Sequence, residues 1–184
     1  MAQLLPIAAA LPFALLCGGR LGRIGELRLR GLWLFFVAFA LQVVAFPFGF
    51  LPWETGEGAA KTLWLVSYGC LLAAAVANRR ILGAQVVALG MALNLVAILS
   101  NGGRMPATPE AMEAAGLDFA VKHNSVASAD PTVPWLVDRF AAPDWVPLTN
   151  VFSAGDVVIA LGAVLLVFAA TGARLPRLSV RRPA

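Results

Sequence analysis

The feature that most constrains this chain is an apolar run close to its C-terminal end. Residues 151–170 contain one charged side chain, Asp156, and as a helix they would be about 30 Å long, which is enough to cross a bilayer. A carboxylate inside such a span is costly unless it faces protein or water, so Asp156 is a candidate functional residue. Alternatively, Ser153 and Asp156 have the spacing of a capping box, in which an acid in the first helical turn only stabilises the helix start.

Four further apolar runs precede this one, at residues 2–17, 31–51, 59–77 and 81–100. The whole chain is 60% hydrophobic and 13% charged, whereas soluble domains are about half apolar and a quarter charged. We therefore expect residues 1–184 to form a single all-α membrane domain with five transmembrane helices.

Basic residues follow a one-sided pattern along these runs. Ten of the fourteen lysines and arginines lie in the loop at residues 20–30, the turn at 79–80 and the tail at 174–182, whereas nine of the ten acids lie elsewhere. The positive-inside rule then predicts an extracytoplasmic N-terminus, a cytoplasmic C-terminus and a multi-pass location in the cell inner (plasma) membrane. Because the basic residues flank apolar runs, the net charge of +4 gives no reason to expect nucleic acid as a partner.

The segment between the fourth and fifth runs, residues 101–150, is the longest polar stretch and is predicted to form a structured extracytoplasmic cap. Thr108-Pro109-Glu110 is a helix start, and Gly116 is a natural stop. Residues 134–140 have the pattern of a short amphipathic helix, with Trp135 and Phe140 at the level of the lipid headgroups.

Several polar residues of this outer region are candidate ligand-binding residues. Asn101-Gly102-Gly103-Arg104 ends the fourth run, and it can form either a simple helix C-cap or a backbone nest with Arg104 facing an anion or carboxylate. Asn94 lies two helical turns below Asn101 at a depth similar to that of Asp156, so the two side chains are expected to be able to meet, although helix packing alone would also explain Asn94.

The remaining candidates are one histidine and the residues that precede the last run. His123 is the sole histidine, and it is accompanied by two cysteines without ligand spacing, so no metal site and no cofactor are expected. Asn150 and Ser153 complete the predicted ligand-binding set, and Asp138 is a second acid of interest that could equally be a surface ion-pair residue.

Two motifs carry a resemblance to a known family. Asn101-Gly102-Gly103-Arg104-Met105-Pro106 and, after His123, the sequence Phe152-Ser153-Ala154-Gly155-Asp156 resemble the NGGxMP and FSxGD signatures of a bacterial family of small membrane proteins of unknown function (DUF5317). The resemblance covers nearly the whole chain. It implies a membrane protein and no particular activity.

A second resemblance is confined to the C-terminal quarter. Val137-Asp138-Arg139 and residues 150–156 are similar in order to two motifs of lipoprotein signal peptidases, which are membrane aspartic proteases. The resemblance implies that Asp138 and Asp156 are catalytic. The chain departs from that family in having Trp135 where an asparagine is expected, a longer spacing before the last acid, and five predicted spans in place of four.

Two functions are therefore expected. The first is a binding, accessory or transport-related membrane protein with an outward-facing polar pocket and membrane lipids as partners. The second is an aspartyl hydrolase that uses Asp138 and Asp156 on a lipid-anchored or membrane-embedded substrate, one acid keeping its proton while the other activates water. The oligomeric state stays open.

Overall fold

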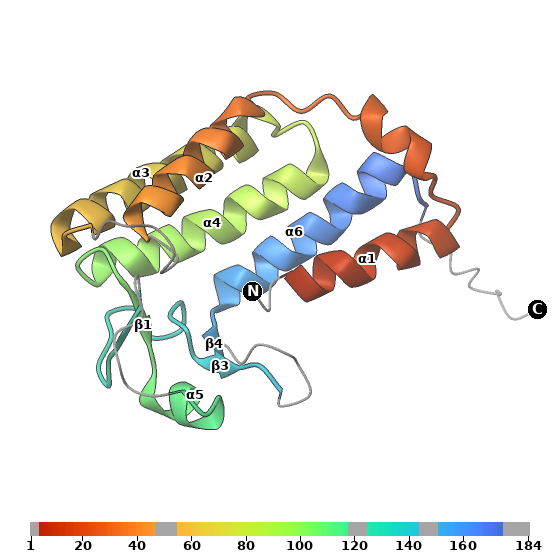
Figure 1. The fold of residues 1–184 in the computed structure, drawn as a ribbon. Helices are drawn as coiled ribbons and strands as arrows, with labels where there is room; N and C mark the ends of the chain where they lie inside the picture. The colour runs from red at the N-terminus through yellow and green to blue at the C-terminus, as the bar shows by residue number, and fades with distance from the viewer. Residues whose placement is uncertain (1–3, 47–54, 118–124, 144–150, 175–184) are drawn as a thin grey trace, which may run out of the picture.

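The protein is mostly helical. A computed structural model describes residues 4–46, 55–117, 125–143 and 151–174, and its five longest described helices are arranged as a bundle with a small cap at one end (Figure 1). These helices are α1 (Leu4–Leu16), α2 (Trp33–Ala45), α3 (Glu57–Ala77), α4 (Leu82–Ser100) and α6 (Ala154–Thr171).

Three of the helices, α3, α4 and α6, are long and apolar enough to cross a membrane. They contain 21, 19 and 18 residues. The described parts of α1 and α2 contain 13 residues each, about 20 Å of helix. The three long helices indicate a membrane protein, and they coincide with three of the five predicted spans.

The helices are grouped in two layers that meet along α4. α2 packs on α3, whereas α4 packs on α6 and α1 lies against the other side of α6 (Figure 1). α1, α3 and α6 run in one direction, and α2 and α4 run back. The loops after α1 and α3, with their arginines, therefore lie at the end of the bundle opposite the cap.

The contact between α4 and α6 depends on glycines. Gly83 and Gly90 of α4 face Gly162 and Gly155 of α6, and each pair lacks the side chains that would hold the backbones apart. A Cβ added at Gly90 would lie 2.6 Å from the Gly155 carbonyl oxygen, and one at Gly162 would lie 2.6 Å from the backbone nitrogen of Val87. Small residues that permit such close approach are a common basis of helix association in membranes.

The cap contains short strands as well as one helix. α5 (Pro109–Ala114) begins where predicted, with the Thr108 hydroxyl accepting from the Ala111 amide. β1 (Met105–Ala107) pairs in parallel with β2 (Ser125–Ala127), and β3 (Phe140–Ala141) pairs antiparallel with β4 (Val151–Phe152). The predicted all-α class is thus correct for the bundle, while the strands of the cap were not predicted.

The amphipathic helix predicted at residues 134–140 is absent, and that prediction was wrong. The backbone there is occupied by bonds to β1, because the Asp138 amide donates to Pro106 and the Asp138 carbonyl accepts from Thr108. Phe140 belongs to β3, where its ring stacks on Phe152. Trp135 is exposed, and its position at the level of the lipid headgroups stays a prediction.

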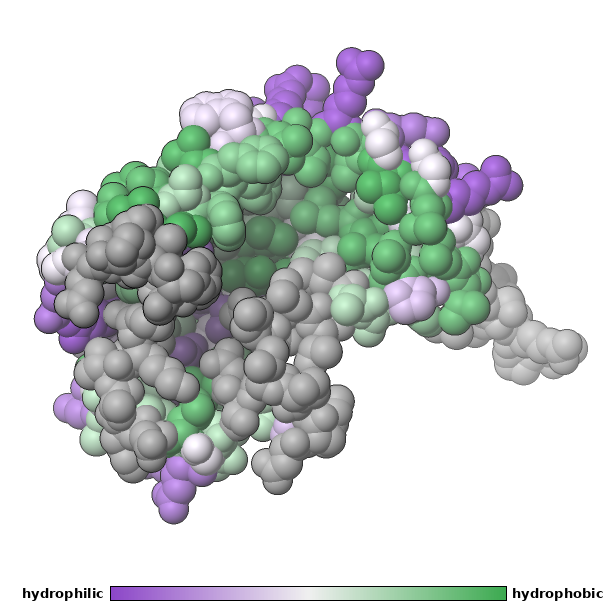
Figure 2. All heavy atoms as spheres, in the orientation of Figure 1, coloured by the Kyte–Doolittle hydropathy of each residue, from purple (hydrophilic) through white to green (hydrophobic). Residues whose placement is uncertain are grey.

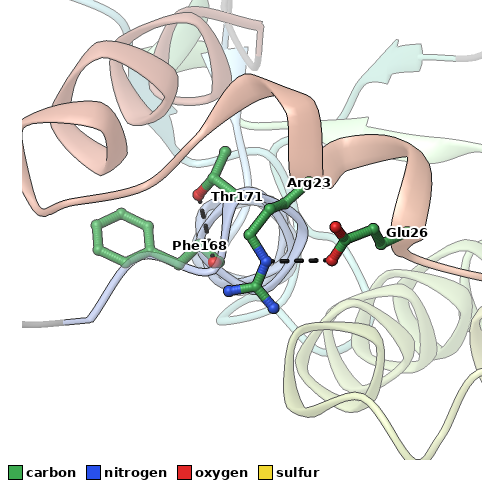
Figure 3. A network of polar contacts seen from close by, with 4 residues as sticks. All are labelled: Arg23, Glu26, Phe168 and Thr171. Carbon is green, nitrogen blue, oxygen red and sulfur yellow. Dashed lines mark hydrogen bonds and ion pairs between the residues drawn. The ribbon is translucent and has the colours of Figure 1, made fainter.

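The opposite end of the bundle is closed by the basic loop. This loop contains the 3-10 helix η1 (Leu21–Glu26), in which Arg23 pairs with Glu26 and lies across the last turn of α6 (Figure 3). A cation at a helix C-terminus is favoured by the helix dipole. Asn78, at the end of α3, exchanges two hydrogen bonds of 2.8 Å with the backbone of Arg30.

The surface residues follow the division of the molecule into an apolar bundle and two polar ends. Figure 2 shows hydrophobic residues over the middle of the molecule, while hydrophilic residues gather beside η1 and around the cap. The hollow at the centre of this face is also hydrophobic.

Candidate functional site

A cavity of about 620 Å³ lies between the two helical layers. It extends along α4 from Ala84 to Ile98, about 21 Å of helix rise. Its wall is apolar for most of this length, and its polar side chains are grouped chiefly near the cap. The described lining residues are Leu29, Phe35, Gln42, Trp64, Tyr68, Leu71, Ala75, Asn78, Ala84, Val87, Met91, Asn94, Ile98, Met105, Asp138, Val151, Asp156, Ile159 and Leu166.

Asp156 belongs to both the helix start and this cavity. α6 begins at Ala154, later than the predicted span at 151, because Val151 and Phe152 pair with β3. Asp156 is therefore in the first turn, in a capping box with Ser153: the Ser153 amide donates to Asp156 Oδ2 and the Ser153 hydroxyl accepts from the Asp156 amide, each at 3.0 Å. The capping reading is confirmed, and Asp156 lines the cavity as well.

Asn94 connects this helix start to α4. Its Nδ2 donates to Asp156 Oδ1 at 2.9 Å, and its Oδ1 accepts from the Ser153 hydroxyl at 2.8 Å. The expected Asn94–Asp156 contact is thus confirmed. Because both arms of the buried Asn94 amide and both Asp156 oxygens have partners, the three residues form one fixed polar network at the outer part of the α4–α6 interface.

Asp138 lies on the cap side of the same cavity. Its backbone is held against β1, and the preceding residue, Val137, is fully buried in a cluster with Trp64, Ile98 and Met105. The Asp138 residue is 7% exposed, and its buried Oδ1 has no hydrogen-bond partner in the described part of the chain.

This environment changes the acidity of Asp138. Burial, and secondarily the nearby charge of Asp156, raise the pKa of the Asp138 carboxyl from 3.8 to about 8. At neutral pH the group is therefore mainly a neutral acid with an O–H to donate. The two aspartates that the sequence singled out face one cavity in different environments.

The other polar groups of the lining are paired. Gln42 donates to the Ser67 hydroxyl at 3.1 Å, and the Tyr68 hydroxyl donates to the Met91 carbonyl at 3.0 Å. Asn78 is occupied by the Arg30 and Ala74 backbones. Among the described lining residues there is no lysine or arginine, so the charge that faces the cavity is acidic.

The turn after α4 connects the helices to the cap through several side-chain contacts. Asn101 binds Thr132 of the cap through both arms of its amide, and Gly102 and Gly103 both have positive φ. Arg104 forms an ion pair with Glu57, and Lys61 donates to the Gly102 carbonyl. These contacts join α3, α4 and the cap, and a ligand role for the turn stays a prediction.

Two predicted binding residues, His123 and Asn150, lie outside the described residues. Within the described ranges, no group of three histidine, cysteine, aspartate or glutamate side chains could hold a metal ion. Cys17 and Cys70 are free thiols.

Sequence reasoning missed the apolar length of the site. Tyr68, Met91 and Trp64 line the cavity, yet each is a typical core residue in a membrane helix and gives no separate signal. The seven-residue spacing of Gly83 with Gly90, and of Gly155 with Gly162, was a usable signal for the α4–α6 contact that leaves the cavity on the α3 side.

Comparison with known proteins gives a family and a distant relative. The model of a family of unknown function, DUF5317, matches residues 26–168. A protein of Thermotoga maritima described as uncharacterized is 26% identical over 153 residues, which cover 80% of this chain and 79% of that protein. No solved structure matches.

The comparisons bear differently on the two resemblances. Neither match is with a lipoprotein signal peptidase, so that resemblance has no support from them. The family match includes both signature motifs and most of the chain, from the basic loop to the last turns of α6. Three long apolar helices indicate that this protein is a membrane protein, and the chain belongs to DUF5317, a family of unknown function.

Proposed function

We propose that the protein binds an amphiphilic molecule in the cavity between its helical layers, with the apolar chain along α4 and the polar group beside Asp138 and Asp156. The observation that carries this proposal is the division of one cavity into a long apolar wall and a short polar end. Amphiphiles have the same division.

The dimensions support a ligand of this kind. Pockets that hold small organic ligands have volumes of about 300–1,000 Å³, and this one has about 620 Å³. The cavity has a largely hydrophobic lining, and Figure 2 shows a hydrophobic hollow on one face of the molecule. In a protein with membrane-spanning helices, the apolar chains of the bilayer are a nearby source of occupants.

The proposal is tested with a substitution that fills the cavity and a measurement of the amount of bound amphiphile. Ala75 lines the cavity on α3, whereas Val76 beside it is exposed and does not. We expect Ala75→Phe protein to lose the lipid that co-purifies with the wild type, as counted by native mass spectrometry, and Val76→Phe protein to retain it. Equal lipid in all three proteins would overturn the proposal.

The membrane arrangement is part of the same proposal. We infer five spans in the plasma membrane, with the cap outside and the arginine-rich loops in the cytoplasm. This inference rests on the position of the arginine-containing loops after α1 and α3, at the end of the bundle opposite the cap (Figure 1). Cysteine labelling should reach position 122 from outside and positions 79 and 177 only from inside, and protection of position 122 from outside would contradict it.

A hydrolase that acts on a membrane-embedded substrate is a second candidate. It rests on the two aspartates that face one cavity, one with a raised pKa and one held by hydrogen bonds, which is the division of roles between acid and base. Loss of activity to the same extent in Asp138→Asn, Asp156→Asn and the double variant would support it. Retained activity in Asp138→Asn protein would exclude Asp138 as a catalytic residue.

A further inference from the structure

We propose that the polar group of the ligand is a primary ammonium, so that the preferred occupant is a single-chain amphiphile with a cationic amine head. This inference rests on the proposed binding function and names the chemistry that its polar end selects. It is carried by three features of that end: an acidic lining with no basic residue among the described lining residues, a buried oxygen with no partner in the described part of the chain, and a buried carboxyl that can exchange a proton.

The first feature is charge. Asp138 and Asp156 both line the cavity. Arg139, the next residue after Asp138, is exposed and lies over the Phe140 ring, while Arg104 pairs with Glu57 and Lys61 donates to Gly102. A phosphate or carboxylate head would thus meet two acids and no counter-charge from the described lining. An ammonium would meet two acids.

The second feature is the free acceptor. The oxygens of Asp156 are already bonded to Asn94 and Ser153, whereas Oδ1 of Asp138 is buried and has no hydrogen-bond partner among the described residues. A buried polar atom without a partner costs free energy, and a ligand that donates a hydrogen bond to it recovers that cost. A primary ammonium has three N–H donors for this oxygen and its neighbours.

The third feature is the Asp138 carboxyl, which can lose its proton when a ligand binds. The titratable groups that line the cavity around Asp138 are Asp156 from α6 and Tyr68 from α3, while α2 and α4 contribute the non-titrating Gln42 and Asn94. Asp138 binds a proton at neutral pH in the free protein because of its burial. An incoming ammonium favours the ionised carboxylate, so one proton passes from Asp138 to the solvent when the amine binds.

The experiment compares three probes of equal chain length: dodecylamine, dodecanol and dodecanoate. The full chain in phosphatidylcholine nanodiscs is titrated calorimetrically at pH 6 and pH 8, with empty nanodiscs as the background. We expect dodecylamine to bind at least tenfold more tightly than dodecanol at pH 8, and its dissociation constant to fall about tenfold or more from pH 6 to pH 8. Dodecanol should show no such fall, and dodecanoate should bind most weakly.

Variants assign the effect to the site. Asp138→Asn should remove the pH dependence and most of the preference for the amine, while Val76→Phe should change neither. In weakly buffered solution the wild type should release about one proton per bound amine and none with dodecanol, a measurement that does not depend on the folding of any variant.

Different failures identify different errors. Equal binding of amine and alcohol, both abolished by Ala75→Phe, would overturn the ammonium inference and leave the binding function intact. Binding of no probe, or binding that Ala75→Phe does not reduce, would overturn the proposed function itself.

Discussion

The two sides of α4 are packed in opposite ways. Toward α6, glycines let the backbones approach, and the Asn94, Ser153 and Asp156 side chains satisfy one another. Toward α2 and α3, larger side chains such as Met91 enclose a cavity, and at its outer end one Asp138 oxygen has no partner in the part of the chain that the structure describes.

The difference separates what holds the bundle together from what is available to a ligand. The α4–α6 interface is close-packed and its polar groups are hydrogen-bonded to one another, so it holds the helices in place. The cavity beside it has space and a hydrogen-bonding group that a ligand can use. Asn94 belongs to both sides, since it bonds to α6 and lines the cavity. The α4–α6 interface thereby fixes the polar end of the site.

The largest effect is expected from breaking the glycine contact. Gly90→Val should prevent correct folding, because a Cβ there would lie 2.6 Å from the Gly155 carbonyl oxygen and 2.7 Å from the Ile159 amide nitrogen, and backbone atoms cannot move aside. The yield of monodisperse protein and its melting temperature measure this.

Gly69→Ala is the matched control for that change. Gly69 lies in α3 with no described atom within 4 Å of its Cβ position, so the substitution should be neutral or stabilise the helix by about 0.5–1 kcal/mol. Similar behaviour of the two variants would show that the α4–α6 contact is not close-packed.

The next effect concerns the unsaturated side. Because the folded pKa of Asp138 is raised from 3.8 to about 8, the folded state holds its proton more tightly, and its contribution to stability is present below pH 4 and lost as the pH rises to about 8. The loss is on the order of a few kcal/mol at about 1.4 kcal/mol per unit of pKa. Melting temperatures across this range should fall in the wild type and fall much less in Asp138→Asn protein. An identical pH dependence in both would contradict the buried position of Asp138.

A smaller effect is expected within the saturated network. In Asp156→Asn protein, one arm of the new amide turns a donor toward the donors of Ser153 or Asn94, which should destabilise the fold by roughly 1–3 kcal/mol. Chemical unfolding measures the change. Loss of less than about 1 kcal/mol would indicate that Asp156 contributes only its interaction with the helix dipole.

The smallest effect should come from the exposed pair at the outer rim. Arg104→Gln removes an ion pair with Glu57, whose side chain is 80% exposed, so the change should be about 0–1 kcal/mol and should decrease further in high salt. A loss above about 2 kcal/mol would mean that the turn after α4 does more than close the bundle end.

Much of this arrangement was predictable from the sequence, and the failures have physical causes. The lengths of the apolar runs predicted the long helices. The similar expected depth of Asn94 and Asp156 in the membrane predicted their contact. The strands of the cap are two or three residues long and depend on partners distant in the chain, so local pattern favoured a helix at residues 134–140 instead. Burial of Asp138 comes from its bonds to β1, which no local feature of Val137-Asp138-Arg139 indicates.

The cavity was harder to predict still. The cavity forms because the helices are unequally spaced. Glycines hold α4 close to α6, whereas the large side chains Trp64, Tyr68 and Met91 keep α3 at a distance. A residue that lines a cavity and one that fills a core look the same in a sequence. Only the unusual glycine spacing hinted at which side of α4 would be closed.

The most direct test of amphiphile binding in the cavity is an experimental structure of the full chain in a lipid nanodisc, at a resolution that resolves apolar chains. We expect continuous density along Val87 and Met91, with its polar end within hydrogen-bond distance of Asp138 Oδ1. A structure in which α2 and α3 close against α6, with no density between the layers and Asp138 bonded to another residue of the chain, would contradict it.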